Sequence, residues 1–305
     1  MAMPSGIGIV DTMIGFPAED FKMYDFIREQ LKDPSAKFDF PVEYMFKTVP
    51  KELYGSGDPI AITLREMDRF GVEVGLIGVG GDVSRKALKD HPDRFVGQGQ
   101  VDPNRGMEGV REMVRQYEEF GVRSFGAFNA GYNPQVGIAD AKMYPIYAKC
   151  VELDVPIFAC AGVPGPRFPM WPQEVRLIDQ VMYDFPELVF VTRHGCEPWE
   201  DLAVKLMLKW PNLYYSTSAF APKHYPEAIV RYANSRGADK IIYAGYFPMG
   251  LSLERIMADM RDVPFKADVW PKFLRDNACK ILKLGRLLST PAPTASSPSP
   301  RPAPR

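Results

Sequence analysis

Eight short runs of apolar or small residues recur along the chain, and this recurrence constrains the fold more than any other feature. Within each run the apolar residues follow one another almost without interruption, which is typical of strands covered on both faces. Strands of this kind occur mainly in parallel sheets flanked by helices. The runs lie at residues 6–12, 72–80, 94–101, 122–128, 155–162, 188–195, 212–219 and 240–247.

The segments between these runs carry the spacing of amphipathic helices. Val110, Met113, Val114 and Tyr117, for example, follow the i, i+3, i+4, i+7 pattern of one helix face. Eight strands with helices between them predict an α/β fold, a single (β/α)8 barrel. The alternative is an open doubly wound sheet, which usually has a glycine-rich phosphate-binding loop after its first strand. Residues 11–17, DTMIGFP, do not form such a loop.

Two segments depart from the regular alternation. Residues 16–57 form an aromatic-rich insertion after the first strand, and long insertions in compact domains usually have a functional or interfacial role. The insertion is expected to add packing or a subunit contact, or to form a lid or pocket wall for an aromatic or apolar substrate. Residues 289–305 contain mainly Pro, Ala and Ser, which predicts a disordered tail, or else a linker or an added extension. The barrel is therefore expected to span residues 1–288.

The composition excludes several partner classes. The formal net charge of −1 gives no indication of nucleic acid or of an anionic membrane as a partner. No apolar run approaches 18 residues, so no membrane-spanning helix is expected, and the N-terminal residues do not resemble a signal peptide. The four cysteines are scattered and form no C-x-x-C pair. Cysteines used in this way favour a reduced, cytoplasmic protein over a disulfide scaffold.

Polar residues stand at several carboxyl ends of the predicted strands, where barrel enzymes place their catalytic groups. His194 follows the sixth strand, and a histidine suits general-base work on water near neutral pH. Tyr246 ends the eighth strand and can donate a hydrogen bond to a developing oxyanion. Asp11 ends the first strand, where it either orients His194 or a water molecule, or bonds to nearby backbone. These three are the predicted catalytic residues.

Other residues near the same strand ends are predicted to contact substrate. Successive strand residues point to opposite faces, so Arg193 is expected to face the helices if His194 faces the barrel mouth. Cys160 has no evident base beside it, and a buried small residue is expected there more than a nucleophile. Arg167 lies in a loop, where it either holds a carboxylate or phosphate or is a solvated charge. The predicted substrate-binding residues are Asn129, Cys160, Arg167, Arg193, Trp199 and His224.

Several of these motifs resemble the strand ends of one known family. GIVDTMIG, VPIFACAGVP, FPELVFVTRHGCEPW, WPNLYYSTSAF and DKIIYAGYFPMG are similar to segments of the amidohydrolase-related barrel family. That family includes aminocarboxymuconate semialdehyde decarboxylase and related non-oxidative decarboxylases and hydrolases. The resemblance spans about residues 7–285 and implies the same (β/α)8 fold.

The resemblance also implies a metal site, which this sequence does not reproduce. The family usually has Asp-x-His-x-His at strand 1, a His at the end of strand 5 and an Asp in a Ser-Asp-x-Pro motif at strand 8. Here Asp11 matches the first Asp, but the two strand-1 histidines fall on Met13 and Gly15. The strand-5 His falls on Cys160 and the strand-8 Asp on Tyr246. Of the family's histidines only the strand-6 residue, His194, is kept, so we expect no metal ligands and no cofactor.

Three functions are consistent with this pattern. The first is metal-independent hydrolysis of a C–C bond in a β-ketoacyl-CoA in aromatic or steroid side-chain catabolism, because a β-keto thioester supplies its own electron sink and needs only a base and oxyanion donors. The second is a metal-dependent non-oxidative decarboxylase or amidohydrolase that holds one divalent ion such as zinc. The third is a non-catalytic barrel that acts as a binding partner. The family resemblance further implies a homo-oligomer, either a dimer or a tetramer.

Overall fold

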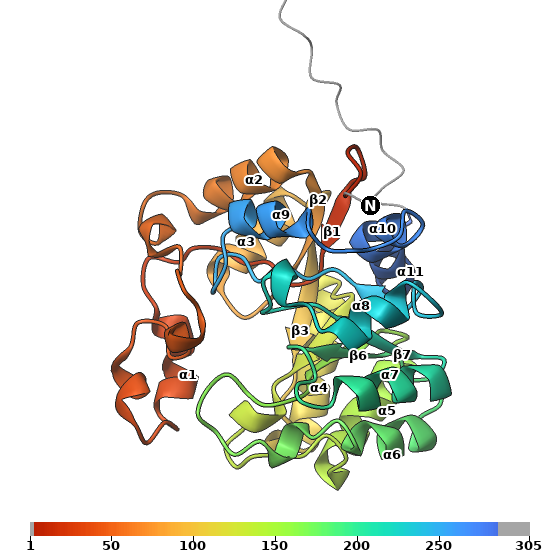
Figure 1. Cartoon of the computed structure of the whole chain (residues 1–305). Helices are drawn as coiled ribbons and strands as arrows, with labels where there is room; N and C mark the ends of the chain where they lie inside the picture. The colour runs from red at the N-terminus through yellow and green to blue at the C-terminus, as the bar shows by residue number, and fades with distance from the viewer. Residues whose placement is uncertain (1–2, 286–305) are drawn as a thin grey trace, which may run out of the picture.

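The chain folds into a (β/α)8 barrel, as its alternating pattern predicted. The computed structural model describes residues 3–285 (Figure 1), and the predicted tail at 289–305 lies outside them. Eight strands pair in parallel in the order of the sequence, from β1 to β8. They are β1 Ile9–Asp11, β2 Val72–Gly78, β3 Phe95–Gln100, β4 Ser124–Ala127, β5 Ile157–Cys160, β6 Phe190–Arg193, β7 Leu213–Ser216 and β8 Ile241–Ile242.

Backbone hydrogen bonds beyond the ends of β1 and β8 close the barrel. The amide of Tyr246 donates to the carbonyl of Met13 at 2.8 Å, and the amide of Gly15 donates to the carbonyl of Phe247 at 2.8 Å. β8 is shorter than the predicted run at 240–247, because the Tyr243 amide leaves the sheet and donates to the Phe273 carbonyl. The chain after β8 is therefore irregular where it reaches the mouth of the barrel.

Helices follow the strands and cover the outside of the barrel. Local chemistry sets their ends: α2 begins after Asp58, whose carboxylate accepts the Ile60 amide, and ends at Gly71 in a left-handed conformation with φ of 72°. None of the helices within residues 3–285 is both long and apolar enough to cross a membrane. The helices are α1 Asp25–Arg28, α2 Pro59–Phe70, α3 Asp82–Asp90, α4 Met107–Phe120, α5 Tyr144–Glu152, α6 Leu177–Asp184, α7 Glu200–Lys209, α8 Glu227–Ala233, α9 Leu253–Met260, α10 Val269–Pro271 and α11 Asn277–Leu282.

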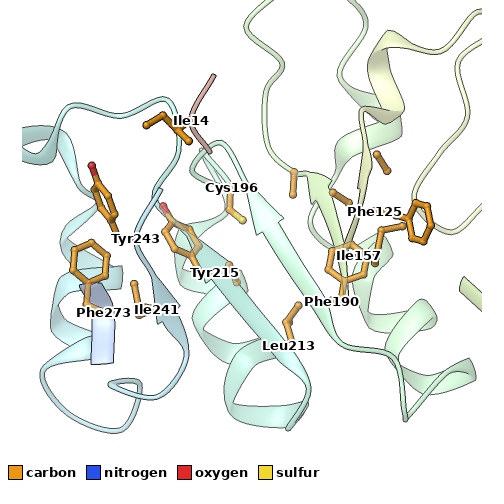
Figure 2. Close-up of a cluster of buried hydrophobic side chains, with 14 of the residues drawn as sticks. Ile14, Phe125, Ile157, Phe190, Cys196, Leu213, Tyr215, Ile241, Tyr243 and Phe273 are labelled. Carbon is orange, nitrogen blue, oxygen red and sulfur yellow. The ribbon is translucent and has the colours of Figure 1, made fainter. Parts of the chain in front are cut away.

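Alternate strand residues build two separate layers of the core. In β5, Ile157 and Ala159 join the outer layer between strands and helices, whereas Phe158 joins the layer inside the barrel. Figure 2 shows part of the outer layer, where the rings of Tyr243 and Phe273 pack edge to face with centroids 5.8 Å apart. Side chains therefore fill both faces of the sheet, in agreement with its uninterrupted apolar runs.

The C-terminal helix closes the end of the barrel at which the strands begin. Ile281 and Leu282 of α11 belong to the inner apolar layer, and the Lys283 ammonium donates to the carbonyl of Asp154, just before β5. The opposite end, where the strands finish, is left for the loops. Polar groups accessible from the barrel interior must therefore lie at the carboxyl ends of the strands.

The insertion at 16–57 contains no strand and lies over the carboxyl ends of the strands. It is built from short helical turns around a small apolar cluster of its own, centred on Tyr24, Ile27, Leu31, Phe40 and Val42. Barrel residues at the mouth, including Phe128 and Tyr246, pack against this cluster. Figure 1 shows the segment in red, with α1, to one side of the barrel.

Candidate active site

Arg193 is the buried cation of the barrel interior, and this corrects the expectation that it faces the helices. Its Nη2 donates to the carbonyl of Thr12 at 3.1 Å, and its Cζ lies 5.0 Å from the ring centroid of Phe158, an inner-layer residue. Only 9% of the residue is exposed. A Cβ at Gly126 would lie only 2.8 Å from Oε1 of Gln98 and at an ordinary contact distance of 3.6 Å from Arg193 Nη1, so the glycine leaves room for the Gln98 side chain beside the guanidinium.

The guanidinium of Arg193 makes no direct ion pair within the described residues, although the buried Asp11 carboxyl acts on it at longer range. The Nε atom of Arg193 has no hydrogen-bond partner among residues 3–285. Burial lowers the pKa of Arg193 to about 10, opposed by Cys160, Tyr246 and Asp11. A buried charge is costly unless it is paired and hydrogen-bonded. The group is therefore suited to receive an anion.

His194 lies beside Arg193 because the backbone turns after β6. His194 has a φ of 66°, in the left-handed region that is rare for non-glycine residues and often found at functional sites. The strand alternation used to place Arg193 therefore no longer holds at this residue. The imidazole packs edge to face on Tyr246, with centroids 5.5 Å apart, and its Nδ1 lies 3.2 Å from the Ser218 hydroxyl. Burial and then the Arg193 charge lower the pKa of His194 to about 3, so the ring is neutral at neutral pH.

Tyr246 completes the group of side chains at the mouth. It also has a left-handed backbone, with φ of 81°, and its ring stacks on Phe46 of the insertion at 5.8 Å. Burial raises the pKa of Tyr246 well above its usual value, so the phenol keeps its proton and can donate. The structure thus brings Arg193, His194 and Tyr246 together, as a cation, a neutral imidazole and a neutral phenol.

Asp11 does not orient His194, and the backbone-bonding alternative describes it instead. Its Oδ1 accepts the amides of Met13 at 2.9 Å and Gly245 at 2.8 Å, which ties β1 to the segment after β8. Oδ2 has no hydrogen-bond partner among the described residues, although the nearby Tyr243 phenol is one of the groups that lower the carboxyl's pKa. Burial is the largest influence and raises the pKa of Asp11 to about 7.

Two further predicted substrate-binding residues, Cys160 and Asn129, are buried near the ends of their strands. The Cys160 thiol ends β5, and burial raises its pKa to about 12, against the lowering effect of Arg193. It is thus the buried small residue expected, because a thiol at this pKa is almost wholly protonated. Asn129 is fully buried and its amide donates to the Val136 carbonyl at 3.0 Å, while its Oδ1 has no partner within residues 3–285.

Three predicted substrate-binding residues lie away from this group. Arg167 pairs with Asp33 of the insertion, and its Cζ lies 4.3 Å from the ring centroid of Tyr44. Its charge is therefore already used to join the loop after β5 to the insertion. Trp199 immediately precedes α7 and packs against the outer layer of the core. His224 is exposed in the turn after β7, where it partly offsets the burial that raises the pKa of Glu197.

Sequence reasoning assigned no role to three residues that contact the group or lie beside it. Ser218 stood among small polar residues after the seventh strand without a role. Phe46 was one of many aromatic residues in the insertion, and nothing in the sequence indicates which of them reaches Tyr246. Gln98 is buried in β3, and its amide donates to Ser124 at 3.0 Å. A glutamine inside an apolar strand was the one signal that could have pointed to a polar barrel interior.

The side chains do not form a metal site of the family type. Among residues 3–285, no three His, Cys, Asp or Glu side chains gather so that they could hold a metal ion. Met13, Gly15 and Cys160 stand where the resemblance in sequence placed the family's histidines. Two cavities of about 190 and 240 Å³ lie elsewhere, the first beside α11 and the second between α3 and α4, and neither is lined by Arg193, His194 or Tyr246. Aromatic rings, with Phe46 over Tyr246, cover the mouth instead.

Comparisons with known proteins agree with this architecture. The chain resembles an uncharacterised TIM-barrel protein from Bordetella bronchiseptica, with a TM-score of 0.70 and 23% identity over 90% of this chain and 98% of that one. It also resembles 5-carboxyvanillate decarboxylase from Sphingomonas paucimobilis (TM-score 0.65, 16% identity, 91% and 99% covered) and 2,6-dihydroxybenzoate decarboxylase from Rhizobium (0.65, 16%, 92% and 99%). A search of curated protein sequences found no significant match.

These likenesses have less than 25% identity and establish the fold. The family is established separately, by the sequence model described as Amidohydrolase, which matches residues 82–284 and hence more than half of the chain. The matched residues include strands β3 to β8 and the side chains of Arg193, His194 and Tyr246. The chain belongs to the amidohydrolase family.

Proposed function

We propose that this chain is a non-oxidative decarboxylase of a small organic acid, in which Arg193 binds the substrate anion. The observation that carries the proposal is the buried guanidinium of Arg193, which has a free Nε–H and no direct ion pair within the described residues. It lies next to two neutral groups, the His194 imidazole and the Tyr246 phenol. A fixed positive charge beside neutral polar groups favours binding of a monoanion over a neutral or a cationic ligand.

The chemistry expected there is cleavage of the bond between a carboxyl group and the adjacent carbon. The substrate needs a carbonyl beside that carbon to receive the electrons. A β-keto acid has one, and a 2-hydroxybenzoic acid acquires one as the ring keto form when a proton adds to the carbon that bears the carboxyl group. The C–C bond breaks, carbon dioxide leaves, and the electron pair moves onto the carbonyl oxygen to give an enolate. Arg193 and Tyr246 supply hydrogen bonds to that oxygen as its charge develops. In a β-keto acid the enolate carbon then takes a proton from water, whereas in a hydroxybenzoic acid the ring carbon has already gained its proton from water. No step in this sequence depends on a metal.

An aromatic acid is the preferred substrate class. The rings of Phe46 and Tyr246 stack at the mouth, and Phe128 and Phe168 lie 6.3 Å apart beside the same insertion. Aromatic side chains gathered at the mouth suit contact with an aryl group. Structurally similar proteins act on aromatic acids, and one of them, from Novosphingobium aromaticivorans, contains manganese. Because the donor set here does not fit such an ion, the proposal for this chain is metal-independent.

Hydrolysis of a β-keto thioester is the second candidate, and it stood first when only the sequence was considered. The neutral state of His194 supports it, because an unprotonated imidazole can take a proton from water. Water would add to the ketone, the C–C bond would break, and the enolate of the thioester would leave and take up a proton. The insertion would have to move aside for an acyl-CoA. The proposed partner is thus a small molecule in both cases, and the predicted homo-oligomer stays a prediction.

A paired substrate screen tests the proposal. The chain is incubated with hydroxybenzoic acids, with aliphatic β-keto acids and with aryl β-keto thioesters, and released carbon dioxide and free carboxylate product are measured separately. Decarboxylation that disappears in Arg193→Met but persists in Arg176→Met, at an exposed arginine, supports the proposal. Thioester cleavage without carbon dioxide favours the second candidate. Turnover that is unaffected by Arg193→Met would refute the role of Arg193, and no turnover at all would favour the non-catalytic barrel.

A further inference from the structure

The hydroxyl of Ser218 holds His194 at two points. Ser218 is fully buried, two residues after the end of β7. Its Oγ accepts the backbone amide of His194 at 3.2 Å and lies 3.2 Å from the Nδ1 atom of the same residue. In the described part of the chain these are the hydrogen bonds that the Ser218 side chain makes. One hydroxyl therefore contacts both the main chain and the ring of the central histidine.

The donor count of this hydroxyl decides which ring nitrogen carries the proton. A serine hydroxyl has one hydrogen to donate and two lone pairs that accept. If Nδ1 carried a proton, Oγ would accept from both the amide and the ring, and its own hydrogen would be left buried without an acceptor. If Nδ1 is unprotonated, the hydroxyl hydrogen bonds to Nδ1 while the oxygen accepts the amide. The second arrangement satisfies every group, and buried polar groups are nearly always satisfied.

We propose that Ser218 fixes His194 in the tautomer that carries its proton on Nε2, so that the imidazole offers an N–H donor to the substrate. Nδ1 is occupied by Ser218, which leaves Nε2 as the ring nitrogen available to a ligand. Ser218 is thereby a positioning residue, acting through His194. This inference rests on the proposed function, and it deepens that function by assigning His194 as a donor instead of a base.

The groups around the ring agree with a neutral, singly protonated imidazole. Burial is the main influence that opposes a second ring proton and lowers the pKa of His194, and the positive charge of Arg193 acts in the same direction. A contact with the main-chain carbonyl of Ser218 acts the other way and raises the pKa of His194 to a smaller extent. If this carbonyl accepts a proton held on Nδ1, the Nδ1–H tautomer is favoured instead, and that is the outcome that would contradict the proposal.

The tautomer of His194 determines which of the two proposed reactions, decarboxylation or thioester hydrolysis, the site supports better. With Nε2–H as donor, Arg193, His194 and Tyr246 are all hydrogen-bond donors facing the same mouth. Three donors stabilise an enolate oxygen, which is what loss of carbon dioxide produces. Hydrolysis of a β-keto thioester requires in addition a base that removes a proton from water. The donor arrangement therefore favours decarboxylation.

Nitrogen NMR of the histidine rings tests the tautomer directly. The protein is labelled with 15N-histidine, and the two-bond correlations between ring nitrogens and ring carbon-bound protons distinguish a protonated from an unprotonated nitrogen. The chain has three histidines, so His91→Gln and His224→Gln variants assign the His194 signals. We expect Nε2 protonated and Nδ1 unprotonated in a ratio of at least about 10:1. A dominant Nδ1–H form, or an even mixture, would overturn the proposal.

Two variants test the role of Ser218 itself. Ser218→Ala removes the hydroxyl and should move the His194 nitrogen signals toward an averaged mixture of tautomers, whereas Ser218→Thr keeps the hydroxyl and should restore the single form. Unchanged signals in Ser218→Ala would mean that another group sets the tautomer. With an active substrate, Ser218→Ala should lower kcat roughly ten-fold with little change in KM. Because the NMR result needs no turnover, absence of activity would count against the proposed function and not against the tautomer.

Discussion

Replacing Asp11 by asparagine should stabilise the protein at alkaline pH, and the size of the effect can be worked from the buried carboxyl. The oxygen of the new side-chain amide would keep both backbone hydrogen bonds, from Met13 and Gly245. The amide nitrogen would take the place of the carboxyl atom Oδ2. That oxygen has no hydrogen-bond partner among the described residues and lies near the Tyr243 phenol. The substitution thus removes a buried negative charge and supplies a donor where an acceptor was unsatisfied.

The pKa difference sets the direction and magnitude. Burial raises the Asp11 pKa from 3.8 to about 7 in the folded state, so between these values the folded chain holds a proton that the unfolded chain has lost. The free energy of unfolding therefore falls as pH rises through this window, by about 1.4 kcal/mol per pH unit. The total is about 4 kcal/mol, all of it lost above about pH 7. A side-chain amide does not titrate and has no such slope.

Urea unfolding followed by circular dichroism, at about pH 5 and about pH 8, measures the effect. We expect Asp11→Asn to exceed the wild-type free energy of unfolding by up to about 4 kcal/mol at the higher pH, with a smaller advantage at the lower pH. Asp93→Asn, at an exposed position, is the matched control and should change neither value. A variant that is less stable than wild type at pH 8, or an advantage that does not grow with pH, would refute the reasoning.

Three further outcomes are expected. Arg193→Met should abolish turnover. It should also raise the free energy of unfolding by about 3 kcal/mol, because it removes a buried charge that has no direct ion pair. Thermal unfolding measures the stability, and a variant less stable than wild type would contradict the prediction. Tyr246→Phe should lower kcat roughly 100-fold, while Tyr183→Phe, at an exposed tyrosine, should leave it unchanged in the same assay. Purified protein should contain less than stoichiometric zinc or manganese by elemental analysis, and dialysis against chelator should not reduce activity; near-stoichiometric metal would show that ligands other than those at the family positions bind it.

The barrel could be predicted from local patterns because those patterns have a direct physical cause. A strand covered on both faces must be apolar on both, so each of the eight buried strands appears as an uninterrupted run. The spacing of helix residues and the glycine at the end of α2 likewise depend on neighbours close in sequence. The end of β8 was harder to place, because the segment after Ile242 leaves the sheet to bond with β1 and Phe273, which are distant in the chain.

The site was predicted in its location and only partly in its geometry. The strand-end rule correctly placed His194 and Tyr246 at one mouth. It gave Arg193 the wrong face relative to His194, because it assumed strand alternation across a residue whose backbone is left-handed. Asp11 and Arg167 were assigned by residue type, but their charges are used for backbone bonding and for pairing with Asp33. Their partners are far away in the sequence.

By itself, then, the sequence determined the order of strands and helices, the family resemblance and the end of the barrel that carries the polar residues. These follow from periodicity and from residue types at positions counted along the chain. Only the tertiary structure decided that Arg193 lies inside the barrel without a direct ion pair among the described residues, that Phe46 covers Tyr246, and that Ser218 contacts His194. Each of these depends on the direction of a side chain and on the burial of its neighbours, and both arise from segments that meet only when the barrel closes.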